Sequence, residues 1–329
     1  MPVPVSSPSE FAFELALCAH LEETTDWLPA RQLGASVFSQ GSRIIDVCAV
    51  VPGPAADFDA RTRITSSAIP APAIESSVGV GRSVFWRDAF DCHPARARRA
   101  TERAVEVGFF ESERRRGREY VRRATRYPDD WFARLVGIEN KPDLGEPGDL
   151  LRQLRLDVSL ALFDEVVLAT ESYVTGAHLN RIPKEVGVWR FDPESGDREV
   201  VREATPLAAD ATGVEPVEYE SLHTDVAFVT PAEKRTARLQ LAERTYGKGW
   251  RRYDLPGCEH ATVDADGRPV CSHFGRVVDP GSECGSDCSA FAPADPPAFD
   301  RERLRDARSD WVADPRGVAR RQSGLDRFS

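Results

Sequence analysis

Lysine is scarce in this chain, and long apolar runs are absent. Of its 43 basic residues only four are Lys, namely Lys141, Lys184, Lys234 and Lys248. No apolar run approaches the roughly 20 residues that a membrane-spanning helix needs, and the N-terminal segment lacks the basic, apolar and small-residue pattern of a secretory signal. We therefore expect a cytoplasmic protein without a membrane partner. Its seven Cys are then thiols or metal ligands before they are disulfides.

Acidic residues dominate what is present, but their excess is uneven. The net charge is −10 with a pI near 5.3, and the chain has one Met, a composition typical of a GC-rich genome and a halophilic cytoplasm. Residues 93–126 depart from this balance with eleven Arg and five Glu, a local net charge of +6. An acidic chain as a whole argues against nucleic-acid partners, whereas a basic segment of this kind favours one. The length of 329 residues allows two or three domains.

An acid and a base stand side by side at the end of an apolar run. The run spans residues 135–142 and carries Glu139 and Lys141 two positions apart. Because side chains on a β-strand alternate with a period of two, these two residues share one face. Two charges at the end of a buried strand cost desolvation energy unless they have partners or a function. The compact Lys ammonium suits a position beside a water or a phosphate oxygen.

Two more acids enter predicted core elements. Glu14 falls on the apolar face of a helix expected over residues 7–24, and Asp46 interrupts a strand expected over residues 42–51. Helices over residues 149–163 and 177–185 alternate with strands over 166–170 and 187–191, and the first of these helices carries Gln153. This alternation predicts an α/β core.

The ordered set of Glu14, Asp46, Glu139-x-Lys141 and Gln153 resembles the PD-(D/E)XK nuclease superfamily over residues 7–53 and 135–192. The resemblance implies a restriction-endonuclease-like mixed sheet flanked by helices. It also implies that Asp46 and Glu139 hold a divalent metal, magnesium or manganese, which Glu14 helps to bind. Lys141 would position the attacking water, and Gln153 would support the site.

Some 92 residues separate Asp46 from Glu139, more than in compact members of this superfamily. A helix over residues 94–108 and a hairpin over 111–125 lie in this gap, so we interpret residues 54–126 as an inserted winged-helix-like module that binds DNA, or less readily RNA. Asp129 and Asp130 are alternative partners of Glu139, although they resemble a surface turn. The arginines expected to contact phosphates are Arg96, Arg99, Arg103, Arg114, Arg115, Arg116 and Arg118.

Residues 258–288 carry four thiols within 31 residues and show almost no apolar periodicity. A segment without an apolar core needs a metal ion or a covalent cross-link to stabilise its fold. Four thiolates suit structural zinc or an iron–sulfur cluster. His260 or His273 could replace one thiol, and unmetallated thiols or disulfides remain alternatives. We divide the chain into a discontinuous core of residues 1–53 and 127–192, the inserted module, an acidic linker, helix and Cys-rich lobe over 193–300, and a charged tail over 301–329. The expected ligands are Cys258, Cys271, Cys284 and Cys288.

Three functions fit these patterns. The first is a magnesium-dependent DNA phosphodiesterase. The second is a protein of the same fold that binds nucleic acid without cleaving it, and the third is a metal-binding regulatory protein built on the Cys cluster. Purely structural alternatives remain for two of these features. Glu139 and Lys141 could form an ordinary ion pair at a strand end, and the basic segment of residues 93–126 could be a solvated charged face.

Overall fold

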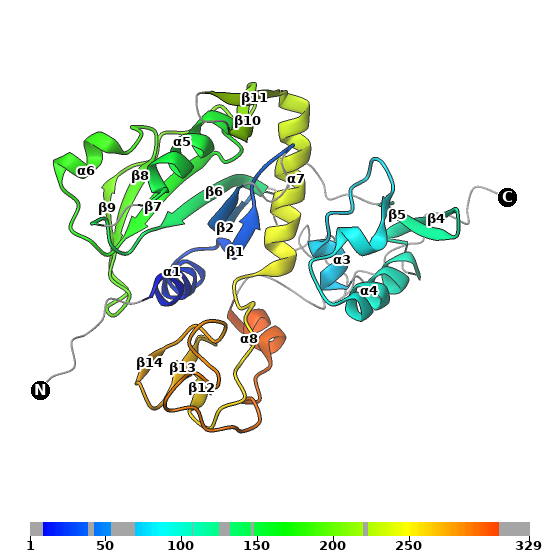
Figure 1. Cartoon of the computed structure of the whole chain (residues 1–329). Coiled ribbons are helices and arrows are strands. Elements are labelled where there is room, and N and C mark those ends of the chain that lie inside the picture. The colour runs from blue at the N-terminus through cyan, green and yellow to red at the C-terminus, as the bar shows by residue number, and fades with distance from the viewer. Residues whose placement is uncertain are drawn as a thin grey trace, which may run out of the picture.

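The computed structural model describes residues 9–38, 43–53, 70–106, 108–124, 132–145, 148–219 and 223–308. Its centre is a six-stranded mixed sheet with the order β1-β2-β6-β7-β8-β9 (Figure 1). The strands of this sheet are β1 (Leu28–Gly34), β2 (Ile44–Pro52), β6 (Phe132–Asn140), β7 (Glu165–Thr170), β8 (Gly187–Phe191) and β9 (Arg198–Arg202).

Strand β2 is antiparallel to both of its neighbours, β1 and β6. Strands β6, β7 and β8 are parallel, and β9 returns antiparallel at the edge. Parallel neighbours need a crossover, which α5 (Leu150–Leu160) and α6 (Gly176–Arg181) supply. The predicted α/β alternation is therefore confirmed, and β1 and β9 are strands that the sequence reasoning did not anticipate.

Helix α1 (Glu10–Thr24) covers one face of the sheet. It begins after Ser9, whose side chain accepts a hydrogen bond from the Ala12 N–H at 3.2 Å. Its apolar residues meet every second residue of β2 and β6, because alternate strand positions face opposite ways. The core on this side comprises Phe13, Leu15, Leu17, Cys18, Leu21, Val47, Ala49, Val136, Ile138, Val167, Trp189, Phe191, Trp250 and Tyr253, among others.

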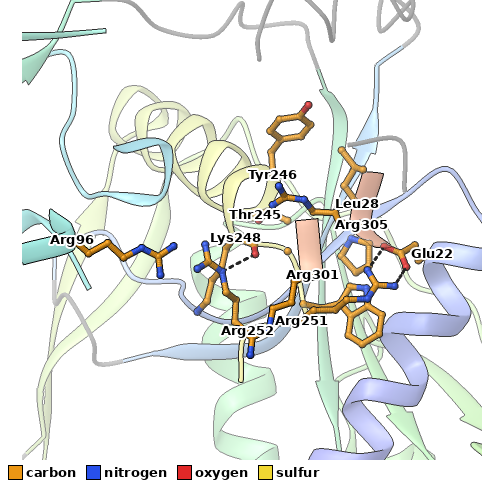
Figure 2. A pocket seen from close by; sticks show the side chains of 13 residues that line it. Glu22, Leu28, Arg96, Thr245, Tyr246, Lys248, Arg251, Arg252, Arg301 and Arg305 are labelled. Carbon is orange, nitrogen blue, oxygen red and sulfur yellow. Dashed lines mark hydrogen bonds and ion pairs between the residues drawn. The ribbon is translucent and has the colours of Figure 1, made fainter. Parts of the chain in front are cut away.

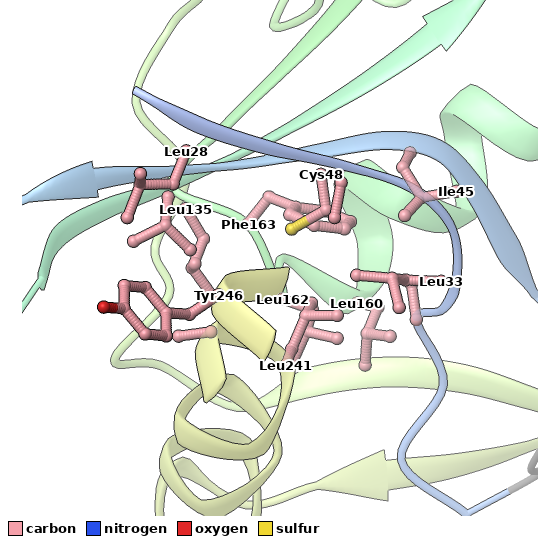
Figure 3. Close-up of a cluster of buried hydrophobic side chains, with 14 of the residues drawn as sticks. Leu28, Leu33, Ile45, Cys48, Leu135, Leu160, Leu162, Phe163, Leu241 and Tyr246 are labelled. Atoms are coloured by element: carbon pink, nitrogen blue, oxygen red, sulfur yellow. The ribbon is translucent and has the colours of Figure 1, made fainter. Parts of the chain in front are cut away.

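Helices α5 and α7 (Pro231–Lys248) cover the other face, where Leu135, Cys48 and Tyr246 lie in one apolar cluster (Figure 3). Gly137 of β6 makes this packing possible, because a Cβ atom built on it would lie 2.7 Å from the Phe163 ring. Since α7 belongs to this cluster, the core extends past residue 192, where the sequence-based division had ended it.

The basic segment forms a small separate sheet with the order β3-β5-β4. Its predicted helix and hairpin are both confirmed. The hairpin turns at Arg116 and Gly117, which both have positive φ (49° and 77°), as a type I′ turn requires. The elements are α3 (Ala71–Glu75), β3 (Val84–Phe85), a 3-10 helix η1 (Trp86–Ala89), α4 (Pro94–Glu106), β4 (Phe110–Arg115) and β5 (Arg118–Arg123).

The last third begins with the hairpin β10–β11, passes through α7, and ends in a lobe with a three-stranded sheet and the short helix α8 (Figure 1). Among the described residues, no helix is both long and apolar enough to cross a membrane. The remaining elements are β10 (Gly213–Tyr219), β11 (Thr224–Val229), β12 (Ala261–Val263), β13 (Pro269–Cys271), β14 (Arg276–Val277) and α8 (Arg301–Arg308).

Candidate functional site

A hydrogen bond between Asp46 and Asn140 links the start of β2 to the end of the neighbouring strand β6. The register of β2 and β6 pairs Val47 with Ile138, so Asp46 lies opposite Glu139 one step further along. Asp46 Oδ2 accepts a hydrogen bond from the Asn140 backbone N–H at 3.0 Å. This contact fixes the Asp46 carboxylate beside the last residues of β6.

Gln32 of β1 connects Asp46 to the helix above it. Its backbone has a positive φ of 52°, which is uncommon outside glycine. The Gln32 side-chain Nε2 donates to Asp46 Oδ1 at 3.3 Å and to Glu14 Oε2 at 2.9 Å. A strained backbone that directs one amide to two acids is the kind of feature that clusters at functional sites.

Glu14 is the buried acid of α1, with 3% of its surface exposed. Its Oε1 atom accepts a hydrogen bond from Arg31 of β1. The Asn140 side-chain amide donates to Glu14 Oε2 at 3.4 Å. The Oδ1 atom of the same amide is buried and has no hydrogen-bond partner among the described residues. An unsatisfied buried acceptor beside a carboxylate is costly unless another group satisfies it.

Glu139 is 2% exposed and points toward the α5 side of the sheet. Its Oε1 atom accepts a hydrogen bond from Arg43, which immediately precedes β2. The same guanidinium makes a two-point contact with Asp157 of α5, at 2.9 and 2.7 Å. Arg43 therefore neutralises two buried acids at once, and a planar guanidinium suits this arrangement better than a Lys ammonium.

Asp46 raises the pKa values of both Glu14 and Glu139. Burial raises the pKa of Glu139 to about 8, with Asp46 adding to the effect and Arg43 opposing it. Burial likewise raises the pKa of Glu14 to about 7, against the Arg31 guanidinium and with a contribution from Asp46. The pKa of Asp46 is also raised by burial. Perturbed acids grouped in this way are candidates for a functional site.

Lys141 lies at the rim of the cluster. Its ammonium forms an ion pair with Glu10, in the first turn of α1. The Lys141 side chain is 23% exposed and the Glu10 side chain 61% exposed, so this pair is accessible to solvent. An exposed pair of this kind contributes little to stability, which leaves Lys141 available to a ligand.

The structure brings together Glu14, Asp46, Glu139 and, at the rim, Lys141. The Gln153 side chain makes no hydrogen bond with any described residue, and the α5 residue that reaches the cluster is Asp157. Asp157 carried a signal in the sequence, because it interrupts the apolar stripe of its helix. No sequence pattern marked Arg31, Gln32 or Arg43 as site residues. The alternative partners of Glu139, Asp129 and Asp130, lie outside the described residues.

The seven arginines expected to meet nucleic acid are all exposed. Arg103 pairs with Glu106 at 2.8 Å and Arg115 pairs with Glu113 at 2.5 Å. The side chains of Arg99, Arg114 and Arg116 make no ion pair with any described residue. The small sheet and α4 thus present a surface with surplus positive charge.

The four thiols of the C-terminal lobe lie near one another. Burial raises the pKa of Cys284, and Cys271, Cys258 and Cys288 raise it further, so all three lie within electrostatic range of Cys284. All four thiols are free. Even so, no three His, Cys, Asp or Glu side chains in the described part of the chain already form a group that could hold a metal ion.

The lobe itself has little apolar packing. Between residues 254 and 300 only Gly267, Pro269 and Val278 are buried. The backbone nevertheless gathers the thiols, because Cys271 pairs with Ala261 across β12 and β13, and Cys258 bridges to Pro293.

Comparison with known protein families matches residues 28–293 to the family described as "Family of unknown function (DUF5787)". This match spans most of the chain, which therefore belongs to that family. No curated protein and no solved structure matches the chain.

Proposed function

We propose that this member of the DUF5787 family is a metal-dependent phosphodiesterase that cleaves nucleic acid, DNA before RNA. One observation carries the proposal: Glu14 and Glu139 are buried, the half-buried Asp46 lies within electrostatic range of both, and all three acids, from three separate elements, have a raised pKa. Asp46 repels both buried acids, and a cation bound at Asp46 would offset this repulsion. The accessible Lys141 lies at the rim of the cluster, paired with Glu10.

The order of the sheet supports a restriction-endonuclease-like core. An opening helix is followed by three antiparallel strands, a crossover helix and a parallel strand. Asp46 and Glu139 lie where β2 begins and β6 ends. The small sheet and α4 support an inserted winged-helix-like module whose arginines contact phosphates.

The donor chemistry suits Mg²⁺ or Mn²⁺. Carboxylate and amide oxygens are hard ligands, and Mg²⁺ keeps several waters, so two or three protein oxygens suffice. The unsatisfied Asn140 Oδ1 and the Glu139 Oε2 atom, which has no hydrogen-bond partner among the described residues, are available acceptors. Arg31 and Arg43 form ion pairs with Glu14 and Glu139. To bind a metal ion, each of these acids must therefore contact the ion and its arginine at the same time.

Each residue then has a defined task. A bound divalent cation polarises the phosphoryl group and favours deprotonation of water. Asp46 and Glu139 would hold it, with Glu14 assisting. Gln32 and the Asn140 N–H keep Asp46 oriented. Lys141 offsets negative charge that develops on the phosphate and orients the attacking water, after the substrate displaces Glu10.

The test is a cleavage assay on supercoiled and linear DNA and on RNA, with Mg²⁺, Mn²⁺ or EDTA. We expect metal-dependent products with the native protein and none with Asp46→Asn. Binding without cleavage under all conditions would replace the enzyme with a nucleic-acid-binding protein of the same fold. The ion pairs of Arg31 and Arg43 favour that second function, because they already neutralise Glu14 and Glu139.

For the C-terminal lobe we propose a structural tetrathiolate site, zinc before an iron–sulfur cluster. A segment with three buried residues in 47 lacks an apolar core of its own, so a metal held by four thiolates would supply the missing stability. The thiols need to move closer together to close the site, which loop-borne ligands permit. Four protein ligands leave no open position, so this metal has no catalytic task.

A further inference from the structure

A basic pocket of about 200 Å³ lies between β1, the end of α7, α4 and α8 (Figure 2). Six of its lining residues are cationic, whereas Glu22 of α1 is the one acid among the lining residues. The six come from three helices and the segment that follows α7. They are Arg96, Lys248, Arg251, Arg252, Arg301 and Arg305.

The acids nearby do not balance this charge. Glu22 is already engaged by Arg251, which binds both of its carboxylate oxygens. Arg252 pairs with Glu75. Among the described residues, Lys248 donates to a single acceptor, the backbone oxygen of Gln32, at 2.9 Å. Arg96 is exposed, and its side chain makes no ion pair or hydrogen bond with any described residue. The pocket therefore carries surplus positive charge, which an anion would balance.

Trp250 provides an independent sign of a ligand. Its ring is 2% exposed and stacks under the Arg251 guanidinium, 4.0 Å from the ring centroid. Trp250 is one of the residues that line this pocket, and its buried Nε1–H has no hydrogen-bond partner among the described residues. An indole N–H can only donate, so the group that satisfies it is an acceptor. Surplus cations and an unsatisfied buried donor both call for an anion with oxygen acceptors.

The pocket adjoins the candidate catalytic cluster. Lys248 binds the backbone oxygen of Gln32, and the Gln32 side chain binds Glu14 and Asp46. Along α1, eight residues separate Glu14 from Glu22, a rise of about 12 Å. This span corresponds to roughly three to four phosphates along one strand of B-form DNA.

Helix α4 extends the positive surface beyond the pocket. Arg96 lines the pocket, and Arg99 and Arg103 follow it at spacings of three and four residues. Residues so spaced lie on one face of a helix. Arg96 thus places the pocket beside this face of α4, as the Lys248 contact places it beside Gln32 and the acid cluster.

We infer that the pocket binds a phosphate group of the substrate strand, a few nucleotides from the phosphate that is cleaved at Asp46 and Glu139. This inference rests on the proposed function and adds to it a fixed contact with the substrate backbone. The Trp250 N–H and the cations of Lys248 and Arg96 contact the phosphate oxygens. Such contacts set the register of the strand and are independent of its base sequence.

The test measures the binding of a fluorescent 12-nucleotide DNA strand in EDTA, so that cleavage does not intervene. The variants are Arg96→Gln, Lys248→Gln and Trp250→Phe. The matched control is Arg181→Gln, an exposed arginine of α6 on the far side of the sheet (Figure 1). We expect each pocket variant to weaken binding about 5- to 20-fold, and the control to change it less than twofold.

Salt dependence separates the roles of the three residues. Loss of one phosphate contact lowers the slope of log K against log salt by about 0.7 for single-stranded DNA. Arg96→Gln and Lys248→Gln should show this decrease. Trp250→Phe should weaken binding at an unchanged slope, because the indole carries no charge. Circular dichroism checks that Trp250→Phe still folds, and the surface variant Arg96→Gln keeps the test decisive if it does not.

Added probes identify the source of the phosphate. Inorganic phosphate at constant ionic strength should displace the strand from the native protein. Strands with and without a 5′-phosphate are compared in parallel: a preference for the first assigns the pocket to a terminal phosphate, and equal affinity assigns it to an internal one. Binding by the pocket variants that equals the Arg181→Gln control would overturn the inference.

The two proposals fail in different ways. If the native protein binds DNA through the pocket yet never cleaves it with Mg²⁺ or Mn²⁺, the catalytic proposal fails and the phosphate site stands. If the native protein cleaves and the pocket variants bind and cleave as well as the control, the phosphate site fails and the catalytic proposal stands.

Discussion

The backbone N–H of Asn140 donates a hydrogen bond to Oδ2 of Asp46 at 3.0 Å, across 94 positions of sequence. This contact ties the motif strand β6 to the preceding core strand β2. It also determines which carboxylate lies beside Glu139, since the residue that carries the N–H immediately follows Glu139. The relative position of the two acids is thus set by backbone pairing and by one carboxylate contact.

Replacing Lys141 by Ala should reduce DNA cleavage at least 100-fold, because the ammonium stabilises charge in the transition state. Folding should change little, since its ion pair with Glu10 is solvent-accessible. Initial cleavage rates in Mg²⁺ measure the effect. Lys184→Ala is the matched control, because Lys184 is exposed and far along the chain. A Lys141→Ala protein that cleaves as fast as this control would remove Lys141 from the mechanism.

Without metal, the acid cluster should make the protein less stable as the pH rises. The folded-state pKa values of Glu14 and Glu139, about 7 and about 8, lie above the ordinary value of 4.5. The folded protein then binds more protons than the unfolded chain between about pH 4.5 and pH 8. Stability therefore falls as the pH rises through this window.

Denaturant unfolding at pH 5, 6, 7 and 8 in EDTA, repeated with Glu139→Gln, measures this contribution. The stability of the native protein relative to the variant should decline with pH, since the variant lacks the titrating group. Mg²⁺ should stabilise the native protein more at pH 8 than at pH 6, because protons compete with the cation. A relative stability that rises with pH would contradict a raised pKa of Glu139 in the folded protein.

Gly137→Ala should destabilise the protein by about 1–3 kcal/mol, because the added methyl group would overlap the Phe163 ring. Gly176→Ala is the control, since a Cβ atom there meets nothing within 4 Å. Thermal unfolding of both variants measures the difference. Equal stability would mean that the Phe163 ring does not pack closely on β6 at Gly137.

Replacing Arg114, Arg115 and Arg116 together by Ser should weaken DNA binding and lower its salt dependence. Each lost phosphate contact lowers the slope of log K against log salt by about 0.9 on duplex DNA. Anisotropy titrations from 50 to 300 mM salt, chosen to span strong and weak screening, give this slope. Unchanged affinity would show that the hairpin is a solvated charged face.

Removing the proposed structural metal should unfold the C-terminal lobe and leave the central sheet intact. Elemental analysis of the purified protein measures zinc and iron directly, and an iron–sulfur cluster would colour it brown. Cys284→Ser should lower the metal content and make the lobe sensitive to protease, whereas the control Cys92→Ser should not. A fully folded native protein without zinc or iron would leave the four thiols without a metal.

The α/β alternation and the acids within apolar elements could be predicted, because strong periodicity and buried charge are local signals. Asp157 also lies on the apolar face of a predicted helix, which is the pattern that singled out Glu14, so it could have been predicted too. Strand β1 could not, because its Arg31 and Gln32 break the apolar run that marks a buried strand. No contact supports the expectation that Gln153 assists the acid cluster, since the α5 residue beside the cluster is Asp157.

The sequence by itself determined the opening helix, the apolar strands β2, β6, β7 and β8, the hairpin with Gly117 at its tip, the surplus charge of the basic segment and the grouping of four thiols along the chain. Only the tertiary structure decided what each buried charge meets. Arg43 lies between Glu139 and Asp157, Gln32 lies between Glu14 and Asp46, and Lys248 joins the basic pocket to this cluster. These contacts link residues far apart in sequence, and their energies depend on burial and distance in three dimensions, which local patterns do not encode.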